Sequence, residues 1–200
     1  SYFLSKLHES LENVTLLSLH GREGALIATV RTSQKVVVLL SRENSIRTVC
    51  EELCEYGLSK VKVTLGECLS YEEERIIEGT AEDFRHIMTD SLCLAYIYNA
   101  NYEQTITPGI PEEHWVRGNI PMTKEEVRII CLSKLKLKKD AILYDIGAGT
   151  GSVAIEAGRF LSEGKVYAIE KEEEGIALIE ANRKKFMVDQ VIPVHGIAPE

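Results

Sequence analysis

The sequence predicts an α/β protein made of two successive pieces. Segments typical of strands alternate with segments typical of helices along the 200 residues, which is the pattern of α/β folds. A strand, a glycine-rich turn and a helix follow one another at residues 142–158. The stretch 99–109, with Asn-Ala-Asn at its start and Thr-Pro-Gly at its end, has the composition of a linker. We therefore divide the chain into residues 1–105 and residues 106–200.

The composition is that of an ordinary globular protein, with 44% hydrophobic and 27% charged residues. The formal net charge of −8 argues against non-specific binding to nucleic acid, which depends on a basic surface. No apolar run approaches the roughly 20 residues that span a bilayer, and the first residues lack the layout of a signal peptide. We expect a cytoplasmic protein that binds neither nucleic acid nor membrane. We also expect a homo-oligomer.

The cysteines do not form a recognisable metal or disulfide pattern. There are five of them, an odd number, and most lie in apolar segments, so we expect reduced thiols. Cys50 and Cys54 would lie one helical turn apart, but no nearby histidine or third cysteine completes a site. We therefore predict no metal.

The first piece is expected to alternate short helices and strands. Apolar spacing and β-branched runs predict helices at 2–12, 25–30 and 44–56, and strands at 14–20, 35–40, 60–67 and 92–98. Ser41 and Asn44 are both candidate caps for the third helix, and Gly57 is expected to end it. Thr80 is expected to begin a further short helix. Glu72-Glu73-Glu74 is expected to be a solvated loop face.

The second piece is expected to contain three strands, at 142–146, 165–169 and 191–195, with helices from 152 and over 171–188. Thr123 is expected to N-cap an earlier helix, with Glu126 completing a capping box. Lys124 and Arg128 fall one turn apart on one face of that helix, and with Arg117 they could form a cationic patch. An ordinary exposed polar face is the alternative. The single Trp115 is expected to anchor packing.

The stretch 142–153 predicts a cofactor-binding corner. Ile142-Leu143-Tyr144 leads into Asp145, and the turn Gly147-Ala148-Gly149-Thr150-Gly151 precedes the helix. The glycines leave the turn without Cβ atoms where a ligand must approach the backbone, and they permit positive φ. The N-terminus of the helix directs its free N–H groups toward such a ligand.

Two acids indicate which ligand this corner binds. A dinucleotide fingerprint, G-x-G-x-x-G, requires no acid before it, whereas Asp145 stands two residues before the first glycine and suits a cationic ligand. Glu170 ends the next strand, where a carboxylate can accept both ribose hydroxyls of a nucleoside. The pair resembles the S-adenosylmethionine site of class I methyltransferases, which we favour over a nicotinamide or flavin site.

Two groups of motifs resemble methyltransferases of cobalamin biosynthesis. Leu-Ser-Leu-His-Gly-Arg at 17–22, with Gly66-Glu67 and Glu74-Arg75-Ile76, resembles the C-terminal part of the corrin-ring C5-methyltransferases, members of the tetrapyrrole methylase superfamily. The motifs at 111–115, 121–128 and 196–200, with the Asp145 turn, resemble the N-terminal part of the decarboxylating C15-methyltransferases. Their order is that of the fused C5,15-methyltransferases. The implied fold is a partial tetrapyrrole methylase C-terminal subdomain followed by a partial class I (Rossmann-like) methyltransferase domain.

This resemblance implies S-adenosylmethionine as cofactor and a corrinoid tetrapyrrole precursor as substrate, methylated at C5 and C15 with loss of the C12 acetate carboxyl group. The implied cofactor-binding residues are Thr123, Asp145, Gly147, Ala148, Gly149, Thr150, Gly151, Glu170 and Ala198. Ala198 would act through its backbone N–H, because Ile197 stands where the family usually has an acid. The residues expected to meet the substrate carboxylates are His20, Arg22, Arg117, Lys124 and Arg128. No catalytic base can be named.

The resemblance also implies missing parts. The N-terminal half of the tetrapyrrole methylase fold does not precede Ser1, and a class I sheet normally has seven strands where three are found. We expect a fragment cut at both ends that does not turn over alone. The alternatives are another class I small-molecule methyltransferase, a nicotinamide-dependent oxidoreductase, or a non-enzymatic scaffold module.

Overall fold

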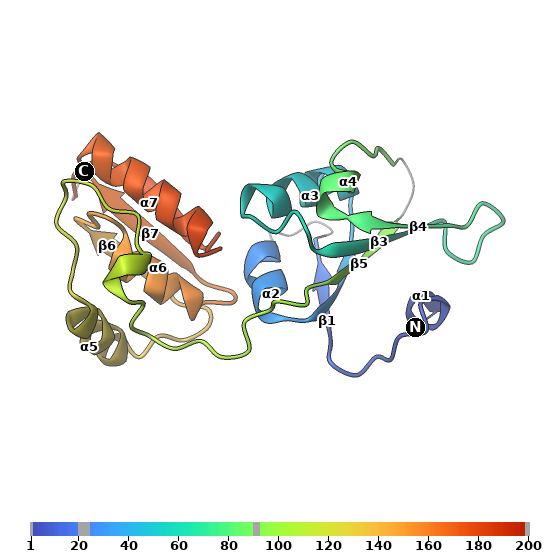
Figure 1. The fold of residues 1–200 in the computed structure, drawn as a ribbon, viewed down its shortest axis with the longest axis horizontal. Helices are drawn as coiled ribbons and strands as arrows, with labels where there is room; N and C mark the ends of the chain where they lie inside the picture. The colour runs from blue at the N-terminus through green and yellow to red at the C-terminus, as the bar shows by residue number, and fades with distance from the viewer. Residues whose placement is uncertain (1, 20–24, 90–92, 199–200) are drawn as a thin grey trace. The chain divides into compact units, whose positions relative to one another are not determined.

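The computed structural model describes residues 2–19, 25–89 and 93–198 of the chain (Figure 1). The fold divides into two compact units, Ser1–Gln104 and Thr105–Glu200. Strands and helices alternate in both units. The predicted α/β class is therefore confirmed.

The first unit is a mixed five-stranded sheet with helices, in the strand order β1-β2-β5-β3-β4. β1 and β2 are parallel, and the other neighbouring strands are antiparallel. In chain order its elements are α1 (Tyr2–Lys6), β1 (Val14–Ser18), α2 (Leu26–Thr32), β2 (Lys35–Leu39), α3 (Ile46–Glu55), β3 (Lys62–Glu67), β4 (Arg75–Thr80), α4 (Ala81–Phe84) and β5 (Cys93–Tyr98).

Strand β2 is buried on both faces, as its β-branched run predicts. Val37 packs with Tyr96 and with Phe3 and Leu4 of α1 on one face. The side chains of Val36 and Val38 alternate to the opposite face and are fully buried there. The predicted helix at 2–12 is shorter than expected, because α1 ends at Lys6.

The structure adds one strand to the prediction for the first unit and corrects one helix cap. Strand β4 was not predicted: it begins at Arg75, which pairs with Glu67 of β3 both in the ladder and through its guanidinium. The N-cap of α3 is Ser45, whose Oγ accepts the Thr48 N–H at 3.3 Å. Ser41 Oγ instead accepts the Asn44 N–H at 3.0 Å, so these two residues close the turn before the helix.

Other local predictions for the first unit are confirmed. Gly57 ends the α3 segment with φ +77°, the left-handed conformation that glycine adopts without steric cost. Thr80 caps α4 in a capping box, in which Asp83 Oδ2 accepts the Thr80 N–H at 2.8 Å.

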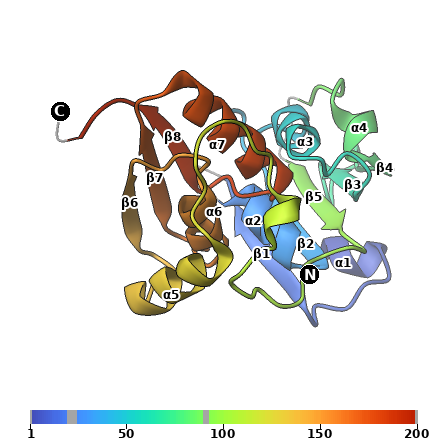
Figure 2. The same cartoon turned by 60° about the vertical axis from the view of Figure 1, so that its left-hand side comes forward.

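The second unit contains a parallel three-stranded sheet in the order β6-β7-β8. Helices α6 and α7 lie on one face of this sheet (Figure 2). In chain order its elements are the 3-10 helix η1 (Glu112–His114), α5 (Glu125–Leu135), β6 (Ile142–Ile146), α6 (Ser152–Arg159), β7 (Lys165–Glu170), α7 (Glu173–Lys185) and β8 (Val191–His195). The three predicted strands are confirmed.

The two faces of this sheet differ in burial. Val166 and Ala168 of β7 are fully buried in the core that α6 and α7 form with the sheet. On the other face Ile142, Tyr144 and Ile146 of β6 remain more than half exposed. Tyr144 stacks there on Tyr167, with ring centroids 5.2 Å apart.

The part of the chain that the structure describes contains no candidate membrane span and no candidate metal cluster. Among these residues, no helix is long and apolar enough to cross a membrane. Within the same ranges, no group of three or more His, Cys, Asp or Glu side chains is placed to hold a metal ion. The five cysteines are free thiols. Burial raises the pKa of Cys50 to about 12, which keeps this thiol protonated and unreactive.

Candidate functional site

The turn from β6 to α6 is a loop of residues 147–151, here called the glycine loop. Gly147, Gly149 and Gly151 all have positive φ, at +74°, +57° and +76°. The N–H groups of Gly147 and Ala148 donate to the carbonyl of Ile169, at 2.9 and 3.0 Å. These bonds hold the start of the loop against the end of β7.

The three glycines serve different purposes. A Cβ atom added to Gly149 would stand 3.2 Å from the carbonyl oxygen of Pro121, and one added to Gly151 would stand 2.9 Å from Cγ1 of Ile179. Close packing and the positive φ therefore both disfavour a larger residue at these two positions. A Cβ added to Gly147 meets nothing within 4 Å. Gly147 thus marks the side of the loop where there is space for a ligand.

Glu170, at the end of β7, is held by backbone groups. Its Oε2 accepts the Gly149 N–H at 2.8 Å, and its Oε1 accepts the N–H groups of Lys171 and Glu172 at 2.8 and 3.0 Å. Burial raises the pKa of Glu170, but these three N–H donors and the Lys171 charge outweigh it and leave the pKa below its ordinary value. The carboxylate is therefore charged, and it fixes the middle of the glycine loop.

Asp145, at the end of β6, is much less well satisfied. Its Oδ2 is buried and has no hydrogen-bond partner among the described residues. Burial raises the pKa of this carboxyl group; the Ala154 N–H opposes that shift, and the negative charge of Glu170 adds to it. A buried, unpaired carboxylate oxygen costs free energy that a cationic ligand would recover.

Thr150 supplies a second buried side-chain oxygen that has no hydrogen-bond partner among the described residues. Its side chain is 1% exposed, and Oγ1 lacks a partner within the described part of the chain. Buried polar atoms without partners are uncommon in folded proteins and call for an explanation. Two buried oxygen atoms, one of Asp145 just before the glycine loop and one of Thr150 within it, are therefore ones that a ligand could satisfy.

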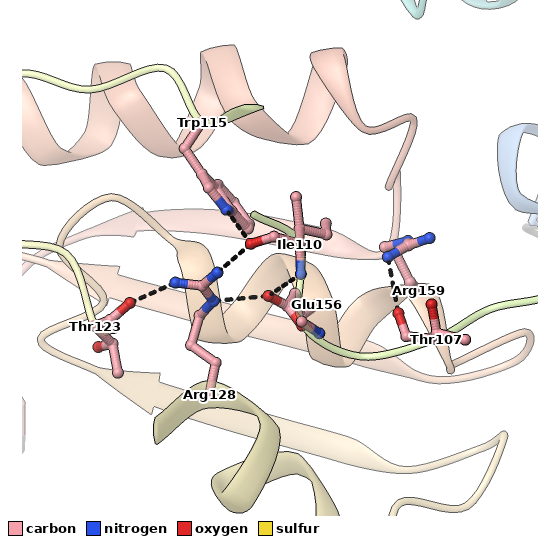
Figure 3. A network of polar contacts seen from close by, with 8 residues as sticks. Thr107, Ile110, Trp115, Thr123, Arg128, Glu156 and Arg159 are labelled. Carbon is pink, nitrogen blue, oxygen red and sulfur yellow. Dashed lines mark hydrogen bonds and ion pairs between the residues drawn. The ribbon is translucent and has the colours of Figure 1, made fainter. Parts of the chain in front are cut away.

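A segment of residues 109–123, here called the strap, runs from the linker to α5. Its two ends are held by the buried ion pair between Arg128 of α5 and Glu156 of α6, whose Nε and Oε1 are 2.7 Å apart. Glu156 also accepts the N–H groups of Gly109 and Ile110, at 2.6 and 3.1 Å. Figure 3 shows the Arg128 guanidinium between the carbonyl of Thr123 on one side and Ile110 and Glu156 on the other.

This network contradicts the predicted surface patch. Arg128 is fully buried, so it does not lie on an exposed face with Lys124 and Arg117. The reason is register: α5 begins at Glu125 with Lys124 as its N-cap residue, and Thr123 makes no side-chain cap. The predicted capping box of Thr123 and Glu126 is therefore wrong.

Lys124 and Arg117 still lie near one another, on either side of an acid. Both pair with Oε2 of Glu112, at 3.1 Å from Lys124 Nζ and 3.6 Å from an Arg117 guanidinium nitrogen. The hydrogen bond from Lys124 is the main reason why the pKa of Glu112 lies below its ordinary value. The two cations are partly exposed and partly neutralised by this acid.

The remaining predicted residues fall in two groups. His20 and Arg22 lie outside the described residues. Ala198 follows β8 and is partly buried. The N–H of Gly196, just before it, donates to the carbonyl of Glu170 at 3.0 Å, so this turn lies at the same sheet edge as Glu170.

Sequence reasoning missed three residues that shape this region. Glu156 is the single charged residue inside the apolar run of α6, and charged side chains are rarely fully buried without a partner; that isolation was the available signal. Asn182 of α7 is fully buried, and no motif in the sequence singles it out. Gly175 allows α7 to approach Glu170, because an added Cβ would stand 2.5 Å from Glu170 Cγ.

Comparisons with known proteins match the second unit. Residues 114–200 match the family described as Precorrin methyltransferase domain. A probable cobalt-precorrin-6B C(15)-methyltransferase (decarboxylating) from Sulfurisphaera tokodaii is 50% identical over 95 residues, which are 46% of this chain and 50% of that protein. The corresponding protein of Salmonella typhimurium is 44% identical over 89 residues, 44% of this chain and 46% of that one.

A solved structure is also similar. The crystal structure of precorrin-6y C5,15-methyltransferase from Geobacter metallireducens is 39% identical, with a TM-score of 0.44, and the match covers 46% of this chain and 49% of that one. The chain spans about half the length of the curated relatives it matches. The predicted resemblance of the second piece is confirmed. The likeness to precorrin methyltransferase domains lies in residues 114–200 of this chain.

Proposed function

We propose that the second unit binds S-adenosylmethionine at the glycine loop, as part of an enzyme that methylates a corrinoid tetrapyrrole precursor. The observation that carries this proposal is the pair of strand-end acids on either side of three left-handed glycines, with one buried oxygen of Asp145 unpaired. The names of the relatives, cobalt-precorrin-6B C(15)-methyltransferases, support the reaction and its decarboxylating outcome.

Each acid has a distinct role in this proposal. Asp145 accepts from the cationic part of the cofactor, whose charge offsets the cost of the buried carboxylate. Glu170 accepts a ribose hydroxyl. A carboxylate has about four acceptor positions, and three of those of Glu170 already bind backbone N–H groups. One position therefore remains, which suits one ribose hydroxyl better than two.

The other predicted contacts are supported by their placement. Because Thr123 does not cap α5, its hydroxyl is not committed to that helix. Thr150 offers a hydroxyl without a partner among the described residues, and there is open space beside Gly147. Ala198, at the same sheet edge as Glu170, offers its backbone N–H to the adenine.

The cofactor supplies a methyl group activated by a sulfonium centre. The contribution of the chain is to hold that group in line with the nucleophilic ring carbon and to keep water away, since positioning provides most of the acceleration of such a transfer. Arg117 and Lys124 would meet carboxylates of the substrate, for which they would exchange their shared partner Glu112. Arg128 is left out of this role.

The proposal for the first unit rests on its sequence motifs. We propose that residues 1–105 are the C-terminal portion of a tetrapyrrole methylase domain acting at C5, with His20 and Arg22 toward the substrate, and that residues 106–200 act at C15 with loss of the C12 acetate carboxyl group. A cytoplasmic location and a homo-oligomer remain predictions from the sequence. The net charge of −8 supports the expectation that nucleic acid is not a partner.

Calorimetry with the intact chain tests the cofactor assignment. We expect S-adenosylmethionine to bind and Gly149→Val to abolish binding, because the side chain would clash with Pro121 and the residue has φ +57°. Gly57→Val is the matched control, since Gly57 has φ +77° but nothing within 4 Å of an added Cβ. It introduces similar backbone strain away from the site and should leave binding unchanged.

Two results would contradict the assignment. Equal affinity of the wild type and Gly149→Val for S-adenosylmethionine would remove the glycine loop from the site. Binding of NADH in place of S-adenosylmethionine, measured in the same titration, would favour the nicotinamide-dependent alternative.

A further inference from the structure

The strap and the glycine loop lie against each other. The carbonyl oxygen of Pro121 would stand 3.2 Å from a Cβ added to Gly149, and Cγ2 of Ile120 would stand 3.4 Å from it. The strap is therefore one wall around the middle of the loop. Any residue that fixes the strap relative to the loop also fixes the space available to a ligand.

One side chain bonds to both segments. Asn182 of α7 is fully buried. Its Oδ1 accepts the Val116 N–H at 2.8 Å, and its Nδ2 donates to the Val116 carbonyl at 3.0 Å and to the Thr150 carbonyl at 3.1 Å. Val116 lies in the strap and Thr150 in the glycine loop.

An amide is the side chain that this position requires. One acceptor must face the Val116 N–H while two donors face carbonyl oxygens, and only an amide offers that set on so short a side chain. The same pattern fixes which end of the amide is nitrogen. A carboxylate of equal size would place negative charge against two carbonyl oxygens with no donor between them.

We propose that Asn182 is a positioning residue that clamps the middle of the strap to the glycine loop and so sets the shape of the cofactor site. This rests on the proposed function for the identity of the ligand, but the clamp itself is a contact between two backbone segments. The ends of the strap are held independently by Arg128 and Glu156. Loss of Asn182 should therefore loosen the middle of the strap and leave its ends in place.

The test compares Asn182→Asp with Gln190→Glu in the intact chain. Gln190 is a matched control, because it is also a buried amide whose nitrogen donates to a backbone carbonyl, that of Leu161 at 2.7 Å, and it bonds neither the strap nor the loop. Both variants exchange a buried amide for a carboxyl group. Three readouts are compared: thermal unfolding, hydrogen exchange of the strap amides, and the Kd for S-adenosylmethionine.

We expect both variants to lower the unfolding temperature, but only Asn182→Asp to speed exchange in peptides that cover 116–120. We expect its Kd to rise roughly tenfold, the scale of one lost buried hydrogen bond, and the Kd of Gln190→Glu to change less than about twofold. Equal Kd values in the two variants, or unchanged exchange in the strap, would overturn the clamp. If the wild type does not bind S-adenosylmethionine, the proposed function fails. The hydrogen-exchange data alone then test whether Asn182 holds the strap to the glycine loop.

A second variant covers the case in which Asn182→Asp does not fold. Glu174→Ala removes only an exposed acceptor, which binds the Asn119 N–H at 2.7 Å further along the strap. We expect normal folding with faster exchange at 118–120 and a smaller rise in Kd. No change in exchange with Glu174→Ala, in a protein whose Asn182→Asp form is unfolded, would also overturn the proposal.

Discussion

Two buried polar clusters in the second unit contrast sharply. The anchor cluster consists of Arg128, Glu156 and the strap backbone at Ile110 and Thr123, and its charged groups bond to one another and to that backbone. The glycine corner consists of the glycine loop with Asp145 and Glu170, and two of its buried oxygens, Asp145 Oδ2 and Thr150 Oγ1, lack partners among the described residues. Both clusters are buried, so burial alone does not distinguish structural polar groups from ligand-binding ones. The difference is whether the buried polar atoms find hydrogen-bond partners among the described residues.

The contrast has a physical basis. A buried charge must be paired and hydrogen-bonded, or it destabilises the fold. The anchor cluster meets this condition with groups of the chain itself. The glycine corner meets this condition only in part. A ligand that bonds to its unpaired oxygens gains free energy, because those oxygens are already in position.

The largest effect is expected in the anchor cluster. Arg128→Met should lower the free energy of unfolding by about 3 to 5 kcal/mol, because it leaves the fully buried Glu156 carboxylate without its cation. Unfolding in urea measures this loss. The double variant Arg128→Met with Glu156→Leu should recover part of it. A loss below about 1 kcal/mol in the single variant would show that the pair is not the support of the strap.

A smaller effect is expected at Glu170. Glu170→Ala should weaken the binding of S-adenosylmethionine by about 1 to 3 kcal/mol, because Gly149, Lys171 and Glu172 lose their shared acceptor and the ribose loses its own. Calorimetry measures the change. Glu170→Gln, which keeps one acceptor oxygen, should lose less. Unchanged affinity in Glu170→Ala would remove this residue from the site.

The pH dependence at Glu170 follows from its lowered pKa. The folded pKa lies below that of the unfolded chain, about 4.3 for Glu. The carboxylate therefore contributes stability above that pH, and the contribution is lost as the pH falls through the folded pKa. The stability difference between wild type and Glu170→Gln should shrink in the same window.

The smallest effect, and one of opposite sign, is expected at Asp145. Asp145→Asn should raise the free energy of unfolding of the ligand-free protein by about 1 kcal/mol, because it removes a buried charge with an unpaired oxygen. The same variant should bind S-adenosylmethionine more weakly. Thermal unfolding and calorimetry on one sample separate the two effects. A variant that is both less stable and equal in affinity would contradict the contrast between the clusters.

The pH window for Asp145 is the reverse of that for Glu170. Its folded pKa is raised, so the destabilising charge develops as the pH rises above the unfolded value of about 3.9 and is complete above the folded pKa. The gain in stability from Asp145→Asn should therefore be absent below the unfolded value, grow as the pH rises, and level off above the folded pKa.

Local patterns in the sequence predicted much of the fold. The strand, glycine loop and helix at 142–158, the helix start at Thr80 and the stop at Gly57 each depend on a few adjacent residues, so the sequence pattern was enough to predict them. Strand β4 could not, because Arg75 sits next to three glutamates and its partner Glu67 is brought to it only by strand pairing.

The candidate site shows the same division. The glycines and both acids were identified from spacing, whereas the pairing of Arg128 with Glu156 depends on the packing of α5 against α6. The spacing of Lys124 and Arg128 predicted a shared exposed face, but the N-cap is Lys124, one residue later than predicted, and Arg128 is buried in the core. Contacts between residues far apart in the chain decide such cases.

The position of Trp115 has a practical consequence. It is the single tryptophan of the chain, and it lies in the strap with its ring 4.6 Å from that of Phe186 and 5.2 Å from the guanidinium carbon of Arg128. Its fluorescence emission is sensitive to that nearby cation and to water. The protein therefore carries its own optical reporter, which follows the strap in solution without an added label.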